Sequence, residues 1–307
     1  MKIAVIGVPM YYGCDNPGTE GAFQALKQAG MIACLEKHGN QVISCQEVQQ
    51  VPVADKYFDP TMEYLPEIQQ MMLDLSQKVR LALEQGAFPL IIGGDHALGI
   101  GSMAGLSYGI SQEDLSVIWM DAHTDINTPD SSPSHHIHGM PLAVGIGEGD
   151  PALTGIGARP VKVNCENVYI YGARSIDPPE WQRIKEKDIR CVTIQEVREK
   201  GWQTALEELL QGVSTPYIHL SFDVDGLDAS VFHATGLPIP NGFTVEEACR
   251  IFERMFATGK ICSMDVVEYS PKADDDGKGI QDVMTMLDTI AMALAKLPDP
   301  TPLPCKG

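Results

Sequence analysis

The stretch from Asp121 to Asn127 carries Asp121, His123 and Asp125 directly after a mostly apolar run, residues 115–120. Such a run is typical of a strand that is buried on both faces of a parallel sheet. Successive strand side chains alternate between faces, so side chains at a spacing of two can point the same way as the chain leaves the sheet. Converging carboxylates and imidazoles would repel or stay unpaired unless a cation lay between them. The stretch therefore predicts half of a metal site.

Two further apolar runs end in side chains of the same kinds. Residues 217–222 lead into Asp223 and Asp225, again at a spacing of two, and residues 88–92 lead into the run Gly93-Gly94-Asp95-His96. The two glycines allow a sharp exit from the strand, and His96 becomes a further candidate ligand. A single Asp-x-Asp or Gly-Gly-Asp is more often a turn or a helix cap. Three such motifs at three strand ends favour a metal site over that interpretation.

Together these motifs supply two histidines and four aspartates, which are too many anionic ligands for one zinc ion. They suit two harder divalent ions, with Mn²⁺ the natural candidate for mixed imidazole and carboxylate ligation. The candidate ligands are His96, Asp121, His123, Asp125, Asp223 and Asp225. Two metals about 3.5 to 4 Å apart can lower the pKa of a shared water molecule and orient it as a nucleophile. The predicted chemistry is metal-assisted hydrolysis with two Mn²⁺ ions per subunit.

Strand-like runs alternate with stretches of helical spacing along the chain. Strands are expected at residues 2–8, 41–47, 88–92, 115–120, 168–172, 189–194, 217–222 and 261–267. Helices are expected at residues 22–38, 67–85, 179–187, 195–211, 245–257 and 279–296. This alternation is typical of β-α-β units. We therefore expect one α/β domain over residues 1–307, a three-layer αβα sandwich with a largely parallel sheet of about eight strands.

Two long irregular segments follow the metal motifs. Residues 127–138 include two prolines and three histidines, and residues 228–242 include two glycines and two prolines. Open α/β sheets bind their ligands at the carboxyl ends of the strands, and long loops there are usually functional. We therefore expect the metal ligands and the loops that select the substrate to share one rim.

The composition of the 307-residue chain limits its partners. A formal net charge of −19 and a pI near 4.7 disfavour nucleic acid and anionic membrane surfaces, and they favour cationic small molecules and metals. The eight cysteines contain no C-x-x-C pair, which disfavours a thiolate zinc site and a secreted disulfide framework. No apolar run approaches about 18 residues, and the N-terminal run fits a first strand better than a signal segment. A cytoplasmic protein is expected.

The three metal motifs resemble the signatures of the ureohydrolases, the arginase and agmatinase superfamily. The matching runs are Gly93-Gly94-Asp95-His96, Asp121-Ala122-His123-Thr124-Asp125 and Ser221-Phe222-Asp223-Val224-Asp225-Gly226-Leu227-Asp228. The resemblance implies that one manganese ion would be held by His96, Asp121, Asp125 and Asp223. It implies that the other would be held by Asp121, His123, Asp223 and Asp225. The implied reaction is attack of a metal-bridging hydroxide on a guanidinium carbon, with release of urea and an amine.

Further positions resemble the arginase branch in particular. Asn127 and Ser134 match the residues with which that branch binds the substrate α-carboxylate. Asp177 resembles the aspartate that addresses the α-amino group, and Glu180 lies near it in the sequence. The resemblance therefore implies that these four residues bind an amino-acid substrate.

The resemblance also implies catalytic roles for His138, Asp125 and Glu268. His138 matches the proton shuttle, a task that suits histidine because its unperturbed pKa lies near the operating pH. Glu268 matches the glutamate that pairs with the guanidinium, and a carboxylate can orient that planar cation through two hydrogen bonds.

L-Arginine, hydrolysed to L-ornithine and urea, is the leading substrate by this resemblance. The chain departs from the usual arginase loops at His135, His136 and Leu237. Agmatine, a guanidino acid or a formimino acid is therefore an alternative, although agmatine has no carboxylate for Asn127 and Ser134. A metal-binding relative without turnover is a further alternative. Arginase relatives form trimers or hexamers, so a homotrimer or homohexamer is expected.

Overall fold

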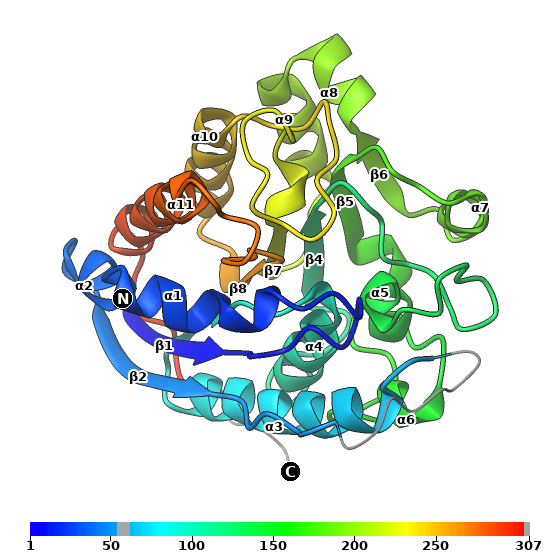
Figure 1. Cartoon of the computed structure of the whole chain (residues 1–307), viewed down its shortest axis with the longest axis horizontal. Coiled ribbons are helices and arrows are strands. Elements are labelled where there is room, and N and C mark those ends of the chain that lie inside the picture. Colours follow the sequence, from blue (N-terminus) through cyan, green and yellow to red (C-terminus); the bar gives the residue numbers. More distant parts are fainter. Residues whose placement is uncertain (54–61, 304–307) are drawn as a thin grey trace.

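Eight strands form one sheet in which every neighbouring pair is parallel (Figure 1). The computed structural model describes residues 1–53 and 62–303. The strands are β1 (Lys2–Gly7), β2 (Gln41–Glu47), β3 (Phe88–Ile92), β4 (Leu115–Met120), β5 (Val168–Ala173), β6 (Arg190–Thr193), β7 (Tyr217–Asp223) and β8 (Ile261–Val267). Their order in the sheet is β2-β1-β3-β8-β7-β4-β5-β6. The predicted αβα architecture is confirmed.

Helices cover both faces of this sheet. They are α1 (Ala22–Gln28), α2 (Met31–Glu36), α3 (Leu65–Glu84), α4 (Gly99–Leu106), α5 (Pro141–Gly145), α6 (Pro151–Thr154), α7 (Pro178–Glu186), α8 (Ile194–Lys200), α9 (Trp202–Gly212), α10 (Val245–Phe256) and α11 (Lys278–Leu294). Apolar residues of α1, α2 and α8 to α11 belong to the core on one face, and those of α3 to α7 belong to the core on the other. The sheet therefore separates two hydrophobic cores.

Strand β4 shows how the sequence supplies both cores. Ile118 and Met120 lie in the core under α8 to α11, whereas Val117 and Trp119 lie in the core under α3 to α7. All four side chains are fully buried. Because neighbouring strand residues point to opposite faces, a strand buried on both sides must be apolar at nearly every position. Each such side chain contributes roughly 1.5 to 3 kcal/mol by leaving water.

Glycines account for the helices that differ from expectation. The helix expected over residues 22–38 breaks at Gly30, and the one expected over residues 195–211 breaks at Gly201. Both have positive φ angles, 93° and 81°, which glycine adopts without strain. Helix α4 was not expected, because its glycine content lowers helix propensity. Its Gly105 lets α3 approach closely, since a Cβ there would lie 2.5 Å from the Cβ of Val79.

The register of the sheet brings the predicted metal motifs together. Met120 of β4 pairs with Phe222 of β7, so the next residues, Asp121 and Asp223, leave adjacent strands at the same level. The all-parallel arrangement places the ends of β3, β8, β7 and β4 side by side at the centre of one edge. On one side of this centre lie β1 and β2, and on the other side lie β5 and β6. Ligand sites of open α/β sheets lie at such a switch in strand order.

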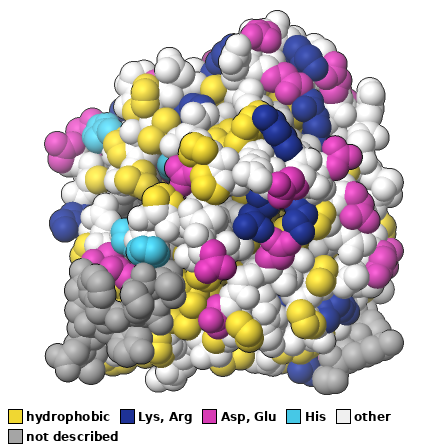
Figure 2. All heavy atoms as spheres, turned by 90° about the vertical axis from the view of Figure 1, so that its right-hand side faces the viewer, with side chains coloured by type: hydrophobic (Ala, Val, Ile, Leu, Met, Phe, Trp, Pro, Cys, Tyr) yellow, Lys and Arg dark blue, Asp and Glu magenta, His cyan; other side chains and the backbone are white. Residues whose placement is uncertain are grey.

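The surface carries charges of both signs. Figure 2 shows Lys and Arg side chains lying among Asp and Glu side chains on one face. Among the ion pairs of the described residues, Glu148 contacts both Arg183 and Lys187. Acidic groups thus interrupt the basic ones among the described side chains of this face, which disfavours the long basic stripe typical of nucleic-acid binding. Within residues 1–53 and 62–303, no helix combines the length and apolarity that crossing a membrane requires.

Candidate active site

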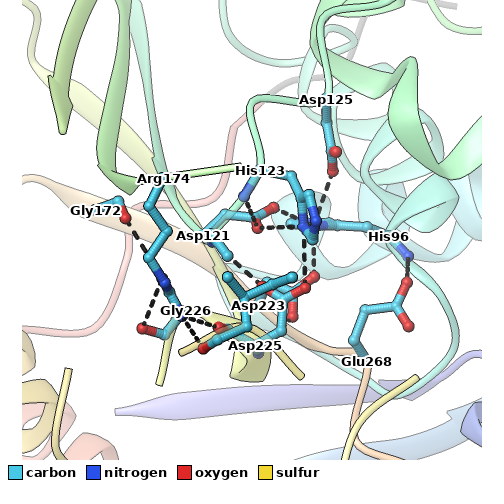
Figure 3. A network of polar contacts seen from close by, with 12 residues as sticks. His96, Asp121, His123, Asp125, Gly172, Arg174, Asp223, Asp225, Gly226 and Glu268 are labelled. Carbon is cyan, nitrogen blue, oxygen red and sulfur yellow. Dashed lines mark hydrogen bonds and ion pairs between the residues drawn. The ribbon is translucent and has the colours of Figure 1, made fainter. Parts of the chain in front are cut away.

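Three carboxylates surround one ring nitrogen of His96 at the ends of β3, β4 and β7 (Figure 3). The Nδ1 atom of His96 lies 3.0 Å from Asp121 and 3.1 Å from Asp223. It also lies 3.2 Å from Asp125. One imidazole nitrogen cannot serve three acceptors at once, and this Nδ1 completes no hydrogen bond with any of them. The arrangement fits a cation held between the imidazole and the carboxylates.

Hydrogen bonds behind His96 fix which of its nitrogens faces the carboxylates. Ser221 Oγ donates to Asp265 Oδ2 at 3.2 Å, and it lies 2.9 Å from His96 Nε2. Because the hydroxyl proton goes to the aspartate, Ser221 accepts from Nε2–H. The lone pair of Nδ1 then points at the carboxylates, as a metal ligand requires.

A second group of ligand atoms shares Asp121 with the first. His123 Nδ1 lies 3.0 Å from Asp225 Oδ2 and 3.5 Å from Asp121 Oδ1. The ligand atoms of Asp121, His123 and Asp225 lie within 4.8 Å of one another, as do those of His96, Asp121 and Asp223. The structure thus places Asp121 between two candidate metal positions. Asp223 falls in the first group alone, and its bridging role stays a prediction.

The protonation of these buried aspartates shows how strongly the site favours positive charge. Burial and the charge of Asp121 raise the pKa of Asp125 to about 7. Burial and the charges of Asp225 and Asp121 raise the pKa of Asp223 well above its usual value. Although burial opposes it, the nearby carboxylates of Asp121, Asp125 and Asp223 raise the pKa of His96 well above its ordinary value. Divalent cations would allow all these carboxylates to ionise together.

Local backbone geometry is unusual at two of the predicted residues. Asp125 and Glu268 adopt left-handed conformations, with φ angles of 47° and 64°. Such conformations cost non-glycine residues roughly 1 to 3 kcal/mol and persist where the surroundings impose them. The N–H group of Glu268 donates to Gly94 O at 3.0 Å, and Asp125 O accepts from Leu142 N–H at 2.9 Å. The backbone of Glu268 is therefore held to the turn after β3, and that of Asp125 is held to α5.

The glycines before His96 serve the sharp turn that the sequence indicated. Gly93 and Gly94 have φ angles of 83° and 79°. A Cβ at Gly94 would lie 2.7 Å from Val8 O, which a real side chain could not tolerate. The next residue, Asp95, caps the short helix that contains His96 by accepting from Ala97 N–H at 3.0 Å.

The predicted substrate residues line the pocket that contains the metal groups. Its volume is about 340 Å³, and its walls include all four predicted substrate-binding residues, namely Asn127, Ser134, Asp177 and Glu180. His138 and Glu268 line it too, as do His136 and Leu237 from the loops that depart from the arginase pattern. The structure therefore brings every predicted site residue except the fully buried Asp121 to the wall of this pocket.

Two of these substrate residues contact each other directly. Asn127 Nδ2 donates to Asp177 Oδ2 at 3.2 Å, and Ser131 donates to the amide oxygen of Asn127 at 2.9 Å. Glu180 accepts from the backbone N–H groups of Ile126 and Asp177, at 3.1 and 3.0 Å. Each Glu180 oxygen thus holds a segment of the rim, which indicates a positioning task for this residue.

His138 and Glu268 form a pair beside the metal groups. Their Nδ1 and Oε1 atoms are 3.4 Å apart. Burial disfavours the charged imidazole, but the hydrogen bond to Glu268 and its charge raise the pKa of His138 above its ordinary value. Glu268 Oε1 also accepts from the backbone N–H of His96 at 2.9 Å. The carboxylate is thereby fixed with respect to the first metal group.

Several supporting residues were not identified from the sequence. Trp119 Nε1 donates to Asp121 Oδ2 at 2.9 Å, and its ring stacks on His96 with centroids 3.9 Å apart. Trp119 and Ser221 precede the candidate ligands Asp121 and Asp223, respectively, by two positions in the sequence. That spacing of two was the available signal. Asp265 carried no comparable signal, and its buried carboxylate accepts from Ser102 at 2.8 Å.

Arg174 holds the loop after β7 in place (Figure 3). Its guanidinium donates to the backbone carbonyls of Asp225 and Leu227, at 2.7 and 2.9 Å, and to that of Ile239 at 2.8 Å. Backbone acceptors leave no trace in the sequence, so this role could not be predicted. Arg174 fixes the segment that carries Asp225 against the 228–242 loop.

Comparisons with known proteins agree with this fold and site. A model of the Arginase family matches residues 1–294. The arginase of Bacillus caldovelox is 36% identical over 283 residues, which are 90% of this chain and 93% of that protein. A solved native structure of B. caldovelox arginase superposes with a TM-score of 0.89 at 34% identity, covering 94% of this chain and 98% of that one.

A second similar structure contains a bound amino acid. The crystal structure of Entamoeba histolytica arginase in complex with L-ornithine has a TM-score of 0.86 at 31% identity and covers 94% of this chain and 98% of that chain.

The fold and the paired groups of histidine and aspartate define a class of α/β metallohydrolases. Within that class, the chain belongs to the arginase family and is a hydrolase. This family binds a binuclear metal centre, and the described residues include groups able to bind metal ions.

Proposed function

We propose that the protein hydrolyses the guanidino group of L-arginine to L-ornithine and urea, with two Mn²⁺ ions bound per subunit. One observation carries the proposal. A single pocket joins the two metal-binding groups to the His138 and Glu268 pair and to the Asn127 and Asp177 pair. Such a pocket offers separate contacts for the guanidinium end and the amino-acid end of one substrate.

The metal ions would be held by the residues that the resemblance assigns. His96, Asp121, Asp125 and Asp223 would bind one ion, and Asp121, His123, Asp223 and Asp225 would bind the other. Bound there, the ions would lower the pKa of water so that it can act as a nucleophile near neutral pH. The lone pair of His96 Nδ1, held toward three carboxylates, supports this assignment.

Glu268 and His138 would act on the guanidinium end. With Oε1 held by the N–H of His96, the Glu268 carboxylate is fixed in orientation to pair with the planar cation. Water adds to the guanidinium carbon, and the bond from that carbon to the side-chain nitrogen of ornithine then breaks. The leaving nitrogen needs a proton, which His138 can hold because Glu268 favours its charged form.

The rim would bind the amino-acid end. Asn127 and Ser134 would donate hydrogen bonds to the α-carboxylate, and Asp177 would accept from the α-ammonium group. Glu180 would keep Asp177 in place through the backbone, as its hydrogen bonds indicate. The complex of the E. histolytica arginase with L-ornithine supports an amino-acid product for this chain as well.

The proposal extends to the compartment and the assembly of the protein. The net charge of −19 and the absence of a membrane-crossing helix among the described residues are consistent with a cytoplasmic protein. One domain and a homotrimeric or homohexameric assembly would follow the arginase pattern. Light scattering of the purified protein gives the number of chains, and a monomer would contradict the proposed assembly.

The direct test is urea release by metal-stripped protein rebuilt with Mn²⁺. L-Arginine, agmatine and a panel of guanidino acids should be compared, and hydrolysis of L-arginine alone would support the proposal. His136 and Leu237 in the pocket wall favour a second candidate, another guanidino or formimino acid. Release of amine from such a substrate, with none from L-arginine, would keep the chemistry and replace the substrate. Inactivity toward all of them with two metals bound would refute the proposal.

A further inference from the structure

Cys14, His138 and Glu268 form a third group of ligand atoms in the pocket region. A thiol sulfur, an imidazole nitrogen and a carboxylate oxygen lie within 4.8 Å of one another. None of these three residues belongs to the two groups assigned to Mn²⁺. Cys14 has no part in the proposed reaction, whereas His138 and Glu268 do. The reaction therefore does not explain why Cys14 lies beside them.

The backbone around Cys14 is held on both sides. Gly13 N–H donates to Asp95 Oδ2 at 2.9 Å, and Gly13 O accepts from His138 N–H at 3.1 Å. A Cβ at Gly13 would lie 2.1 Å from the Asp95 carboxylate, so the approach depends on glycine. The backbone next to Cys14 is thus held beside His138 by the fold.

The thiol itself is weakly engaged and protonated. Its sulfur lies 3.5 Å from Tyr11 O and 3.9 Å from Asn16 O, long contacts that it could give up at little cost. Burial and the charges of Glu268 and Asp95 raise the pKa of Cys14 far above its ordinary value. A neutral thiol reacts poorly with oxidants, which argues against a redox switch. A divalent cation would reverse that electrostatic penalty and bind the thiolate.

We propose that Cys14, His138 and Glu268 form a separate site for Zn²⁺. Sulfur, nitrogen and oxygen ligands from three side chains suit zinc, which leaves a fourth position for water. This donor set differs from the manganese groups by its soft sulfur ligand, which favours zinc over manganese. Filling the site would take His138 and Glu268 from the substrate and would inhibit hydrolysis. That inhibition rests on the proposed function, whereas the binding of the metal does not.

The binding test uses Co²⁺ as a spectroscopic probe for zinc in the Mn²⁺-loaded protein. The manganese groups contain no sulfur, so a sulfur-to-cobalt charge-transfer band would report a thiolate ligand alone. The band should appear as Co²⁺ is added, should disappear on competition with Zn²⁺, and should be absent from Cys14→Ser. Cys45→Ser, on β2, is the matched control and should keep the band. No band in the wild type, or an equal band in Cys14→Ser, would overturn the proposal.

The activity test adds buffered Zn²⁺ to the Mn²⁺-loaded enzyme during urea release. Zinc should inhibit the wild type. Cys14→Ser should need more than about tenfold more zinc for the same inhibition. Loss of a residue that only hydrogen-bonds to a metal ligand already lowers metal affinity by about tenfold or more, and loss of a ligand itself should lower it further. Urea release by Cys14→Ser without zinc should stay near that of the wild type. Equal zinc sensitivity of the two proteins would refute the inhibitory role. If the enzyme releases no urea at all, the cobalt band still decides whether the site exists.

Discussion

The floor and the rim of the pocket are built differently. The floor comes from the ends of β3, β4 and β7, and its His96, Asp121 and Asp223 are almost completely buried. The rim comes from the loops 127–138 and 228–242 and from the start of α7 with Asp177 and Glu180. In the two loops Ser134 is exposed and Leu237 is 46% exposed. Floor side chains are fixed by neighbours on adjacent strands, whereas rim side chains can change without disturbing the sheet. We therefore propose that the floor determines the reaction and that the rim determines the substrate.

The largest effect is expected at the floor, for Asp121→Asn. Asp121 contacts both histidine ligands, so loss of its charge should release both metal ions. Turnover should fall by at least about a thousandfold, equivalent to roughly 4 kcal/mol of lost stabilisation of the transition state. Metal analysis and urea release measure the two effects.

Asp228→Asn is the matched control, because Asp228 is an aspartate at the end of the motif at residues 221–228 and lies outside both metal groups. It should retain both metals and nearly full activity. Full metal occupancy in Asp121→Asn would contradict the shared position assigned to this residue.

His138→Asn should give the next largest effect, since His138 ends the loop 127–138 and lies beside Glu268. Removal of a proton donor should slow turnover about 100- to 1000-fold. The Mn²⁺ content should stay at the wild-type value, because His138 is in neither manganese group. Steady-state rates and metal analysis of the same sample test this prediction, and unchanged turnover would exclude the shuttle role.

At the rim, His136→Asn should alter recognition more than chemistry. His136 lines the pocket near Ser134, whose hydroxyl accepts from its N–H at 3.3 Å. We expect KM for L-arginine to fall by up to about tenfold, the effect of one or two hydrogen bonds, with kcat nearly unchanged. His233→Asn, outside the pocket, should change neither constant. A large loss of kcat in His136→Asn would break the division between floor and rim.

The smallest expected effect concerns stability without metal. The folded pKa of Asp125 is raised to about 7 from an ordinary value of 3.8. A carboxyl group with a raised folded pKa stabilises the fold below its unfolded pKa, and this contribution is lost as pH rises toward 7.

The metal-free protein should therefore lose about 5 °C of Tm between pH 4 and pH 7 relative to the Mn²⁺-loaded protein. Calorimetry of both forms across this range measures the difference. Parallel pH dependence of the two forms would contradict the electrostatic account of the floor.

The sequence predicted the candidate metal ligands of the floor better than the residues that hold these ligands in place. Strand ends reveal themselves through apolar runs, and titratable residues at a spacing of two share a direction, so the convergence of His96, Asp121 and Asp223 was predictable. The roles of Trp119, Ser221 and Arg174 depend on contacts between distant segments. No local pattern encodes such contacts.

The helical layers show the same limit. The break at Gly30 and the glycine-rich helix α4 depend on backbone conformation and on close packing with α3. Helix propensity alone predicts that the glycine-rich segment of α4 is not helical. The segment is helical because tertiary packing overrides this propensity. The functional roles of Asn127 and Asp177 remain predictions, although the structure places them in contact.

The most direct test of the account is the manganese centre itself. Protein stripped of metal and rebuilt with Mn²⁺ should be measured by metal analysis and electron paramagnetic resonance on one sample. We predict two ions per chain with a spin-coupled spectrum, because Asp121 faces both histidine ligands. One uncoupled ion per chain, with full urea release, would contradict the central claim that the floor binds a metal pair.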